Sequence, residues 1–301
     1  MADRVFVTGA TGFLGSHLVD CLTERGTAIT ALVRNRSDLS TRNAASVTFL
    51  QGDLTHPFSI IDATTVFHLA AISHVGHALK DPRRTFETNT AGTVNVLEAI
   101  RCSSTVQKLV FVSTAHVYGP PRYLPIDEAH PLQAHEPYAA SKLAAEAFVS
   151  AYGSAYGLPV AIARLFNVYG PRQHPDFVIP SIINQALVKD ALSLGNLTPT
   201  RDFTYVDDVI DALIQLATVG KGVYNVGSGV EVSIETLVTL IARILDKRVT
   251  TTSTQKRRRP NDVEIDRMWA DNSRIRALGW CPRVGLTEGL RRTIGWFKQP
   301  R

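Results

Sequence analysis

The stretch that decides the fold is Thr8-Gly9-Ala10-Thr11-Gly12-Phe13-Leu14-Gly15, close to the start of this 301-residue sequence. It follows an apolar run at residues 4–8 that is typical of a buried strand, and it opens a helical pattern over residues 13–25. The first glycine allows a tight turn, the second lets the backbone approach a phosphate, and the third lets helix and strand pack closely. The helix amino terminus supplies N–H donors and a partial positive charge. This arrangement predicts a binding site for the pyrophosphate of a dinucleotide.

The alternation of apolar runs and helical patterns continues beyond this stretch. Further strands are expected at residues 28–33, 47–50, 65–69, 108–113 and 159–165, and long helices at residues 88–101 and 137–156. Short strands rich in β-branched residues, separated by helices of this length, pair in parallel with helices on both faces. Right-handed crossovers then predict an α/β fold with a doubly wound parallel sheet, the Rossmann arrangement.

A change of pattern after Phe166 predicts a second lobe. Prolines interrupt residues 167–200, whereas a helix at 205–219 and a strand at 223–226 return to the sheet. From Ser233 onward we expect two helices with a basic loop between them. The expected division is a dinucleotide-binding domain of residues 1–166, to which 201–229 returns, and a smaller, mainly helical substrate-binding lobe within 167–301, formed mainly by 167–200 and 230–301.

The composition excludes several classes of protein. Hydrophobic residues make up 45% of the chain, but no stretch approaches the roughly 18 consecutive apolar residues of a membrane span. The first apolar run begins too early to leave room for a signal peptide, so we expect a cytoplasmic protein with no membrane partner. The three cysteines lie far apart, which suits free thiols in a reducing compartment. Neither they nor the histidines have metal-ligand spacing, and we expect no metal.

The basic character of the chain does not indicate a nucleic-acid partner. The net charge is +5, but the basic residues are scattered. The densest run, Lys256-Arg257-Arg258-Arg259, has no interleaved aromatic residues on which bases of a single strand could stack. These residues form either a solvated surface or a site for a doubly phosphorylated small ligand.

The end of the second expected strand bears on the choice of cofactor. Dinucleotide sites usually carry an acid there for the ribose hydroxyls, but Val33 is followed by Arg34, with Arg36 two residues further on. Two guanidinium groups suit a 2′-phosphate, so we expect NADP, with NAD as the alternative if these arginines are only exposed loop residues. Asp53, after the third strand, is placed to accept a hydrogen bond from the adenine amino group.

A candidate catalytic group follows in Tyr138-Ala139-Ala140-Ser141-Lys142. The tyrosine and the lysine are four residues apart, so they lie on one helical face. A lysine ammonium and a positive nicotinamide nearby favour the phenolate, which would make Tyr138 a general base near neutrality. Thr114 ends the strand before this helix, at the carboxyl edge of the sheet where ligands sit, and can bond the same substrate oxygen.

These motifs together resemble the extended short-chain dehydrogenases/reductases of the nucleotide-sugar epimerase and dehydratase class. The matching pieces span almost the whole chain: Thr8–Gly15, Gly52-Asp53-Leu54, His68-Leu69-Ala70-Ala71, Asn89 with Gly92-Thr93, Thr114–Gly119, Tyr138–Lys142, Arg164–Pro171, Arg201-Asp202-Phe203 and Tyr224–Gly229. The resemblance implies that Tyr138 is the base, that Lys142 orients it and holds the nicotinamide ribose, and that Thr114 anchors the sugar hydroxyl.

The residues expected to bind ligands form two sets, one for the cofactor and one for the substrate. The expected cofactor-binding residues are Gly9, Thr11, Gly12, Phe13, Leu14, Gly15, Arg34, Arg36, Asp53, Leu54, Leu69, Ala70, Ala71, Asn89, Tyr138 and Lys142. The resemblance also implies that a nucleotide-diphosphate sugar is the substrate, and that Asn167, Arg201 and Arg259 contact its diphosphate, since an arginine fork bonds two oxygens at once. Thr114 and His116 would complete the substrate site.

The residues after Thr114 discriminate between reactions that share a 4-keto sugar. The dehydratases of this class carry an acidic residue two positions after the catalytic threonine, where this chain has His116 after Ala115. An alanine directly after the catalytic hydroxyl is common to epimerases and reductases. We therefore expect an epimerase that transfers hydride at C4, while Arg34 favours the alternative of an NADPH-dependent 4-ketoreductase. His116 is expected to line the pocket, with a catalytic role as the alternative.

Two further hypotheses stay open at this stage. A 4,6-dehydratase remains an alternative because Gly195-Asn196-Leu197 and residues 259–280 resemble the dehydratases and reductases. A non-catalytic NADP-binding sensor is an alternative of another class, but such proteins characteristically lack the tyrosine or the lysine. Many relatives pair through the two long helices, so we also expect a homodimer.

Overall fold

The structure, a computed structural model, describes residues 4–35, 44–253 and 264–299. It divides into two compact units. The first consists of Met1–Val117, Leu132–Leu165 and Ile210–Tyr224, and the second of Tyr118–Pro131, Phe166–Val209 and Asn225–Arg301. No helix among the described residues is both long and apolar enough to span a membrane.

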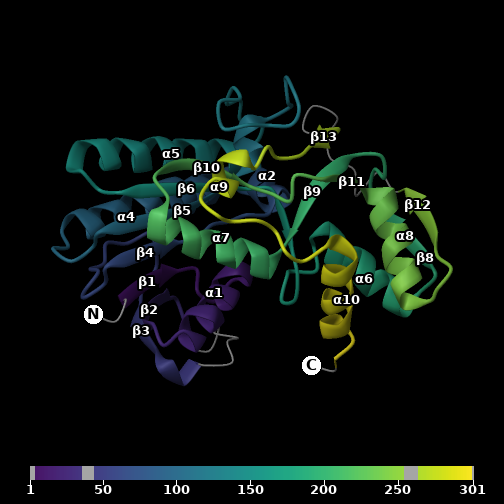
Figure 1. Cartoon of the computed structure of the whole chain (residues 1–301), viewed down its shortest axis with the longest axis horizontal. Coiled ribbons are helices and arrows are strands. Elements are labelled where there is room, and N and C mark those ends of the chain that lie inside the picture. Colours follow the sequence, from purple (N-terminus) through teal and green to yellow (C-terminus); the bar gives the residue numbers. More distant parts are fainter. Residues whose placement is uncertain (1–3, 36–43, 254–263, 300–301) are drawn as a thin grey trace. The chain divides into compact units, whose positions relative to one another are not determined.

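A seven-stranded sheet is the centre of the first unit (Figure 1). Its strands are β1 (Arg4–Thr8), β2 (Ala28–Val33), β3 (Val47–Gln51), β4 (Thr65–His68), β5 (Lys108–Thr114), β6 (Val160–Leu165) and β10 (Gly222–Val226). Their order is β10-β6-β5-β4-β1-β2-β3, and the neighbours from β6 to β3 pair in parallel. The strand order reverses between β1 and β4, the position at which such sheets bind ligands. The predicted doubly wound sheet is confirmed.

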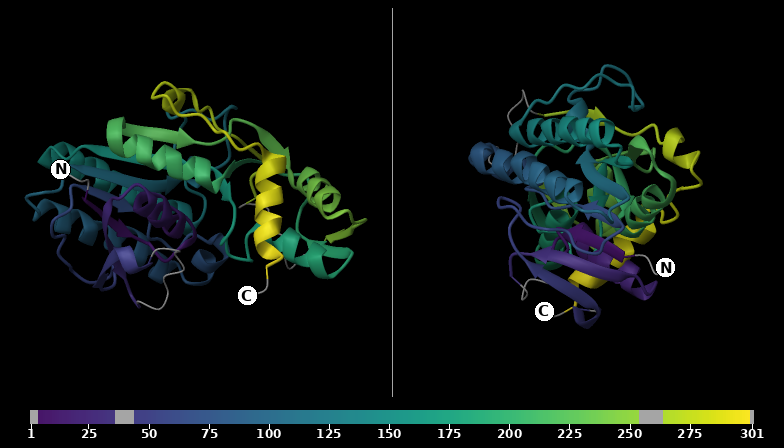
Figure 2. Two further views of the ribbon diagram at one scale, coloured as in Figure 1. Left: turned by 60° about the horizontal axis from the view of Figure 1, so that its bottom comes forward. Right: turned by 90° about the vertical axis from the view of Figure 1, so that its left-hand side faces the viewer.

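Helices cover both faces of this sheet. The four longest are α1 (Phe13–Glu24), α4 (Gly92–Arg101), α5 (Pro137–Tyr156) and α7 (Val206–Val219). Helices α4 and α5 pack against each other on one face, and α1 and α7 cover the other, where Arg25 after α1 pairs with Asp211 in α7 (Figures 1 and 2). The core beneath α4 and α5 includes Phe6, Val66, Leu109, Phe111, Val96, Ile100, Ala145 and Val149. Its apolar contacts fix the two helices against the strands.

The segment before α4 is more complex than the single helix predicted for residues 88–101. It contains α2 (Val75–Lys80), α3 (Pro82–Phe86) and the π-helical turn η3 (Glu87–Ala91), which leads directly into α4. A π-helical turn inserts one extra residue into a helix and frequently occurs at functional sites. Here it carries Asn89. There are also two 3₁₀ turns: η2 (Ala44–Ser46) precedes β3, and η4 (Ala115–Tyr118) follows β5.

The second unit contains short strands beside the helices expected from the sequence. Its helices are α6 (Val178–Val188), α8 (Ile234–Leu245), α9 (Ser273–Arg276) and α10 (Leu286–Phe297). A four-stranded sheet contains β7 (Asn167–Tyr169), β9 (Thr200–Tyr205), β11 (Glu231–Ser233) and β13 (Arg267–Met268), and β8 (Ala191–Leu194) pairs with β12 (Thr250–Ser253). These strands are short and pair with remote segments, which leaves little local pattern in the sequence.

The boundaries of the units differ from the expected domains at residues 118–131, 201–209 and 225–229, all of which belong to the second unit. Strand β9 pairs with β7, β11 and β13, so residues 200–209 belong to the second unit. Residues 118–131 also belong there, because the Ile126 amide donates to the Trp269 carbonyl (3.0 Å) and Ile126 accepts from the Asp271 amide (2.8 Å). The assignment of cofactor and substrate to separate domains stays a prediction.

Candidate active site

The glycine turn between β1 and α1 has the shape of a cradle. Gly9 has a φ of 76°, and a Cβ atom there would lie 2.7 Å from the Ala70 nitrogen. A Cβ atom at Gly15 would overlap the carbonyl oxygen of Gly9. Gly12 is the N-cap residue of α1, and no side chain caps the helix there. The turn therefore has room for a pyrophosphate: only glycine leaves the space, and the first N–H groups of α1 have no side-chain cap and would be free to donate to an anion.

The ends of β2 and β3 bring two of the predicted cofactor residues together. Arg34 follows β2 and is exposed, and Asp53 follows β3. The Thr55 amide and hydroxyl both donate to Asp53 Oδ1 at 2.9 Å. These bonds, with a smaller contribution from Arg34, lower the pKa of Asp53. Arg36 lies outside the described residues.

A buried chain of hydrogen bonds starts at Thr8, directly before the glycine turn. His68 Nδ1 is 2.6 Å from the Thr8 hydroxyl, and its Nε2 is 2.9 Å from the Thr93 hydroxyl. Thr93 donates to the Asn89 carbonyl (2.6 Å) and so must accept from His68. Burial lowers the pKa of His68 to about 3, so the imidazole is neutral and carries its proton on Nε2. The Ala70 amide donates to Thr8 (3.3 Å) and completes the chain.

Asn89 links this chain to the helix that carries the tyrosine. Its amide accepts from the Ile72 nitrogen (2.7 Å) and donates to the Ile72 carbonyl (3.0 Å) and the Ser141 hydroxyl (2.9 Å). Ser141 in turn donates to the Tyr138 carbonyl (2.8 Å). Asn89 was predicted to bind the cofactor; its contacts here support the loop after β4 and the start of α5. That loop carries three other predicted cofactor residues, Leu69, Ala70 and Ala71, all partly exposed.

The predicted catalytic residues meet at the carboxyl edge of the sheet. Thr114 ends β5, Tyr138 lies in the first turn of α5, and their side chains are hydrogen-bonded. Burial raises the pKa of Tyr138 to about 12, although the bond from Thr114 lowers it. We expected a phenolate near neutrality with a lysine ammonium and a positive nicotinamide nearby, and that stays a prediction; in the chain by itself the phenol keeps its proton. The reason is desolvation, which disfavours the anion until a positive charge is close.

Lys142 lies one turn further along α5 and is buried. Its Nζ is 4.0 Å from the centre of the Phe111 ring, and burial lowers its pKa to about 7. Glu146, another turn along, raises this pKa and forms a buried ion pair with Arg164 of β6 (2.6 Å). The sequence analysis missed the role of Glu146, although its i+4 spacing from Lys142 on one helical face was visible.

Glu136 is a second residue that the sequence analysis missed. It is the N-cap of α5, and its carboxylate accepts from the amides of Tyr138 and Ala139, both at 2.8 Å. His116 Nδ1 lies 3.7 Å from Glu136 Oε1. An acid directly before a proline and a helical pattern is a recognisable cap signal, but the pairing with His116 depends on the fold.

Two predicted substrate ligands belong to the second unit. Asn167 starts β7 and pairs in register with Phe203 of β9, the strand that also carries Arg201. Arg201 is buried, donates to the Thr200 carbonyl (2.8 Å) and lies 3.7 Å from Glu264. The two residues therefore lie on neighbouring strands of one sheet. Arg259 lies outside the described residues.

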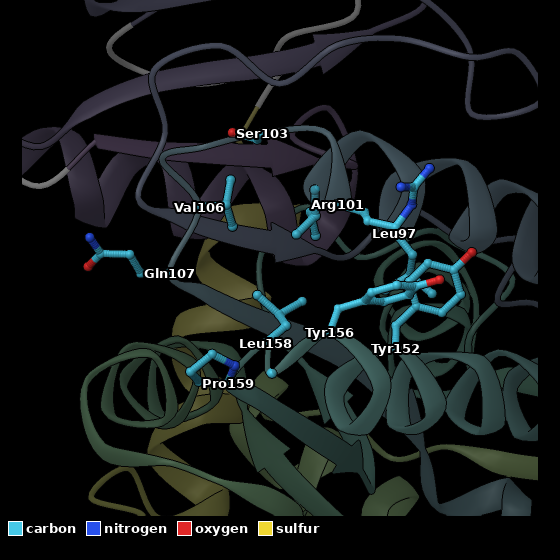
Figure 3. A pocket seen from close by; sticks show the side chains of 11 residues that line it. Leu97, Arg101, Ser103, Val106, Gln107, Tyr152, Tyr156, Leu158 and Pro159 are labelled. Atoms are coloured by element: carbon cyan, nitrogen blue, oxygen red, sulfur yellow. The ribbon is translucent and has the colours of Figure 1, made fainter.

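The first unit also has a hollow of about 540 Å³ at its other end (Figure 3). It lies where the chain passes from α4 to β5 and from α5 to β6. Tyr152 donates to Glu98 (2.6 Å), and the guanidinium of Arg101 lies 5.8 Å from the centre of the Tyr156 ring. None of the predicted site residues lines this hollow. Among the described residues, no group of histidine, cysteine and acidic side chains could hold a metal ion.

Comparisons with known proteins identify the family of the chain. A family described as GDP-mannose 4,6 dehydratase matches residues 6–293. A putative UDP-glucose 4-epimerase of Methanocaldococcus jannaschii is 33% identical over 98% of both chains. The structure of UDP-glucose 4-epimerase from Thermotoga maritima with UDP-glucose is similar over 98% of both chains (TM-score 0.89, 29% identity). So is RMD from Pseudomonas aeruginosa, complexed with NADPH, over 99% of both chains (TM-score 0.86, 32% identity).

Other solved neighbours are complexes with NAD, so the related proteins include users of either nicotinamide cofactor. The matches cover nearly the whole chain and name epimerases, a dehydratase family and a reductase. The chain is an NAD(P)-dependent enzyme of the extended short-chain dehydrogenases/reductases and belongs to the GDP-mannose 4,6-dehydratase family of nucleotide-sugar epimerases, dehydratases and reductases.

Proposed function

We propose that the protein is an epimerase that inverts C4 of a nucleotide-diphosphate sugar through a 4-keto intermediate. The observation that carries this proposal is the composition of the edge after β5. Thr114 is hydrogen-bonded to Tyr138, but the next two residues are Ala115 and His116, so no carboxylate stands two positions after the threonine. Loss of water across C5 and C6 needs a group beside the threonine that transfers protons there; Ala115 can transfer none, and His116 only partly substitutes for a carboxylate.

The chain's own residues supply the proton chemistry of this reaction. When bound, the nicotinamide accepts a hydride and returns it. Tyr138 takes the proton of the sugar 4-hydroxyl and later gives one back to the same oxygen. Thr114 holds that oxygen, and the Lys142 ammonium stabilises the phenolate that burial alone disfavours. Asn167, Arg201 and Arg259 bind the diphosphate.

Arg34 supports NADP as the cofactor, and with it a second candidate function. The guanidinium lies exposed at the end of β2, beside Asp53, where the 2′-phosphate of NADP would need a cation. An enzyme that draws on NADPH suits reduction of a 4-keto-6-deoxy sugar made elsewhere. The protein would then perform only the return half of the epimerase reaction, with the same residues.

The deciding experiment is incubation with UDP-, GDP-, CDP- and dTDP-sugars and their 4-keto derivatives, followed by NMR of the products. We expect a C4 epimer from one of the sugars; reduction of a supplied ketone without epimerisation would favour the reductase. The reaction is run in heavy water. Solvent deuterium at C5 together with loss of the 6-hydroxyl would contradict both proposals and identify a dehydratase.

We also propose a homodimer that pairs through α4 and α5. Large apolar side chains are exposed on this side of the first unit: Phe148 and Tyr156 on α5 are 44% and 58% exposed, and Phe86, shortly before α4, is 54% exposed. Exposed apolar side chains of this kind mark interaction surfaces. Light scattering should give the mass of a dimer, and Phe148→Glu should give a monomer. A monomeric unmodified protein would contradict the proposal.

A further inference from the structure

Glu136 caps the helix that carries Tyr138 with an unusual side chain. Serine, threonine, asparagine and aspartate are the preferred N-cap residues, and they need only one side-chain oxygen. Glu136 uses both oxygens: Oε2 accepts from the Tyr138 amide and Oε1 from the Ala139 amide, each at 2.8 Å. Its side chain is 4% exposed. The carboxylate is therefore fixed in position beside the reacting groups.

His116 is the group that this fixed carboxylate faces. Its Nδ1 lies 3.7 Å from Glu136 Oε1, and its ring meets the Tyr138 ring edge-on, with 6.0 Å between the centres. Its backbone amide donates to the Thr114 hydroxyl (3.2 Å). The imidazole thus stands between the N-cap of α5 and the two residues that hold the sugar oxygen, and 19% of its side chain remains exposed.

The carboxylate by itself works against the general base. A negative charge near the phenol disfavours the phenolate, and Glu136 raises the pKa of Tyr138. A neutral cap such as serine would hold the helix without this disadvantage. An imidazolium at His116 cancels the unfavourable effect of the Glu136 carboxylate on the phenolate, because the ion pair of His116 and Glu136 carries no net charge.

We propose that Glu136 is a positioning residue that acts through His116: it holds the imidazole in its protonated form beside Tyr138, as a charged donor toward the sugar. This inference rests on the proposed function, because it concerns the same proton transfer. The titratable groups Glu136 and Tyr138, both from α5, contact His116, and Lys142 follows one turn later. His135, next to Glu136, is exposed.

The first test follows the imidazole directly. The protein is labelled on histidine, saturated with NADP, and titrated by NMR. Removing an opposite charge at this distance shifts a titration by about one unit or more. Glu136→Ser should therefore move the midpoint of His116 to lower pH by about one unit, while the serine still caps α5. An unchanged midpoint would overturn the proposal.

Asp81→Ser is the matched control. Asp81 is also an acidic N-cap, of α3, and accepts from the Arg84 amide at 3.0 Å. This variant should leave both the titration of His116 and the rate unchanged. Glu136→Asn, with another preferred cap residue, replaces the serine variant if thermal melting shows that the latter does not fold.

The second test is a double-mutant cycle on the epimerase rate. His116→Gln leaves the carboxylate uncompensated and should lower kcat about 10-fold, less than the loss of about 10² to 10⁴ for a general acid or base, because His116 donates a hydrogen bond but transfers no proton. The double variant with Glu136→Ser should have a kcat about 3-fold higher than that of His116→Gln alone, since the negative charge that opposes the phenolate is gone. Residues that act independently give multiplied effects, and that result would overturn the proposal. The NMR titration needs no substrate, so a failure of the proposed function would leave its result interpretable.

Discussion

The two ends of α5 carry tyrosines that titrate alike for different reasons. Tyr138 at the amino end and Tyr152 near the carboxyl end both have a pKa of about 12. For Tyr138 the main cause is burial, whereas for Tyr152 it is the hydrogen bond that its hydroxyl donates to Glu98. Both phenols are protonated at neutral pH, as an ordinary tyrosine is, but desolvation is the main cause of the raised pKa only for the first.

The difference shows why one phenol can serve as a base and the other cannot. Desolvation is offset by a cation that enters the same buried space, and Lys142 lies one turn further along the helix. At Tyr152 the carboxylate is adjacent and already paired with Arg101 (2.6 Å), so an added cation has little effect. A nearby cation can therefore lower the pKa of the tyrosine at one end of the helix, but it has little effect on the pKa of the tyrosine at the other end.

Removing the hydroxyl of each tyrosine in turn should reveal the largest difference in activity between the two ends of α5. Tyr138→Phe should lower kcat by a factor of about 10² to 10⁴, the range for losing a general acid or base, while cofactor binding persists. Tyr152→Phe is the matched control and should leave kcat within about twofold. Steady-state rates and calorimetric binding of NADP check both statements. Equal losses from the two variants would end the comparison.

The buried lysine should show itself in the pH dependence of stability. The unfolded chain keeps the Lys142 proton up to about pH 10.5, whereas the folded chain releases it at about pH 7. Between these values the unfolded state binds more protons, so stability rises with pH, by an upper limit of about 5 kcal/mol at about 1.4 kcal/mol per unit.

Lys142→Met should remove this rise, measured by urea unfolding between pH 7 and 10. The exposed Lys80 provides the control, and Lys80→Met should retain the rise. The same slope in the Lys142 variant would show that the ammonium is not desolvated.

Arg34 lies at the same edge of the sheet as Tyr138. The unmodified protein should bind NADP more tightly than NAD, and Arg34→Ala should narrow the difference by about 10- to 100-fold, since one charge-assisted hydrogen bond is worth about 1.5–3 kcal/mol. Calorimetry at a single ionic strength measures both affinities. Arg25→Ala, which removes an exposed arginine paired with Asp211, should change neither. Equal affinities in the unmodified protein would contradict the assignment.

The smallest expected effect concerns the carboxyl end of α5. Glu98→Gln should bring the pKa of Tyr152 down toward its usual value, because the carboxylate is the main cause of its shift. Ultraviolet titration of the phenolate in a background of Tyr156→Phe measures this change. Activity should not respond. A rate change would mean that the hollow near Tyr152 influences the site at the other end.

Much of the first unit followed from local pattern alone. Helix α5 begins and ends as predicted, because Pro137 suits the first helical position and Gly157 adopts a φ of 66° after the last. In the second unit, helix α6 was missed because Pro180 was interpreted as a break. This proline lies in the first turn of the helix, where an N–H group would have no helical partner.

Some features of the site are local in the sequence and could be predicted, whereas others depend on the fold. The glycine turn and the spacing of Tyr138 and Lys142 are local features, and the sequence placed them correctly at one sheet edge. The pairing of Glu136 with His116 joins residues 20 positions apart through the fold. The raised pKa of Tyr138 also escaped the sequence, since it depends on how deeply the ring is buried and not on its neighbours along the helix.

The chain of hydrogen bonds from Thr8 through His68 to Thr93 has a consequence for proton exchange with water. Every donor in it points the same way, so the Nε2 proton of His68 can leave only if several bonds open together. His68 is also 1% exposed. Its ring proton should therefore persist in heavy water long after surface imidazoles have exchanged, and its single resonance would report when β4 and α4 separate.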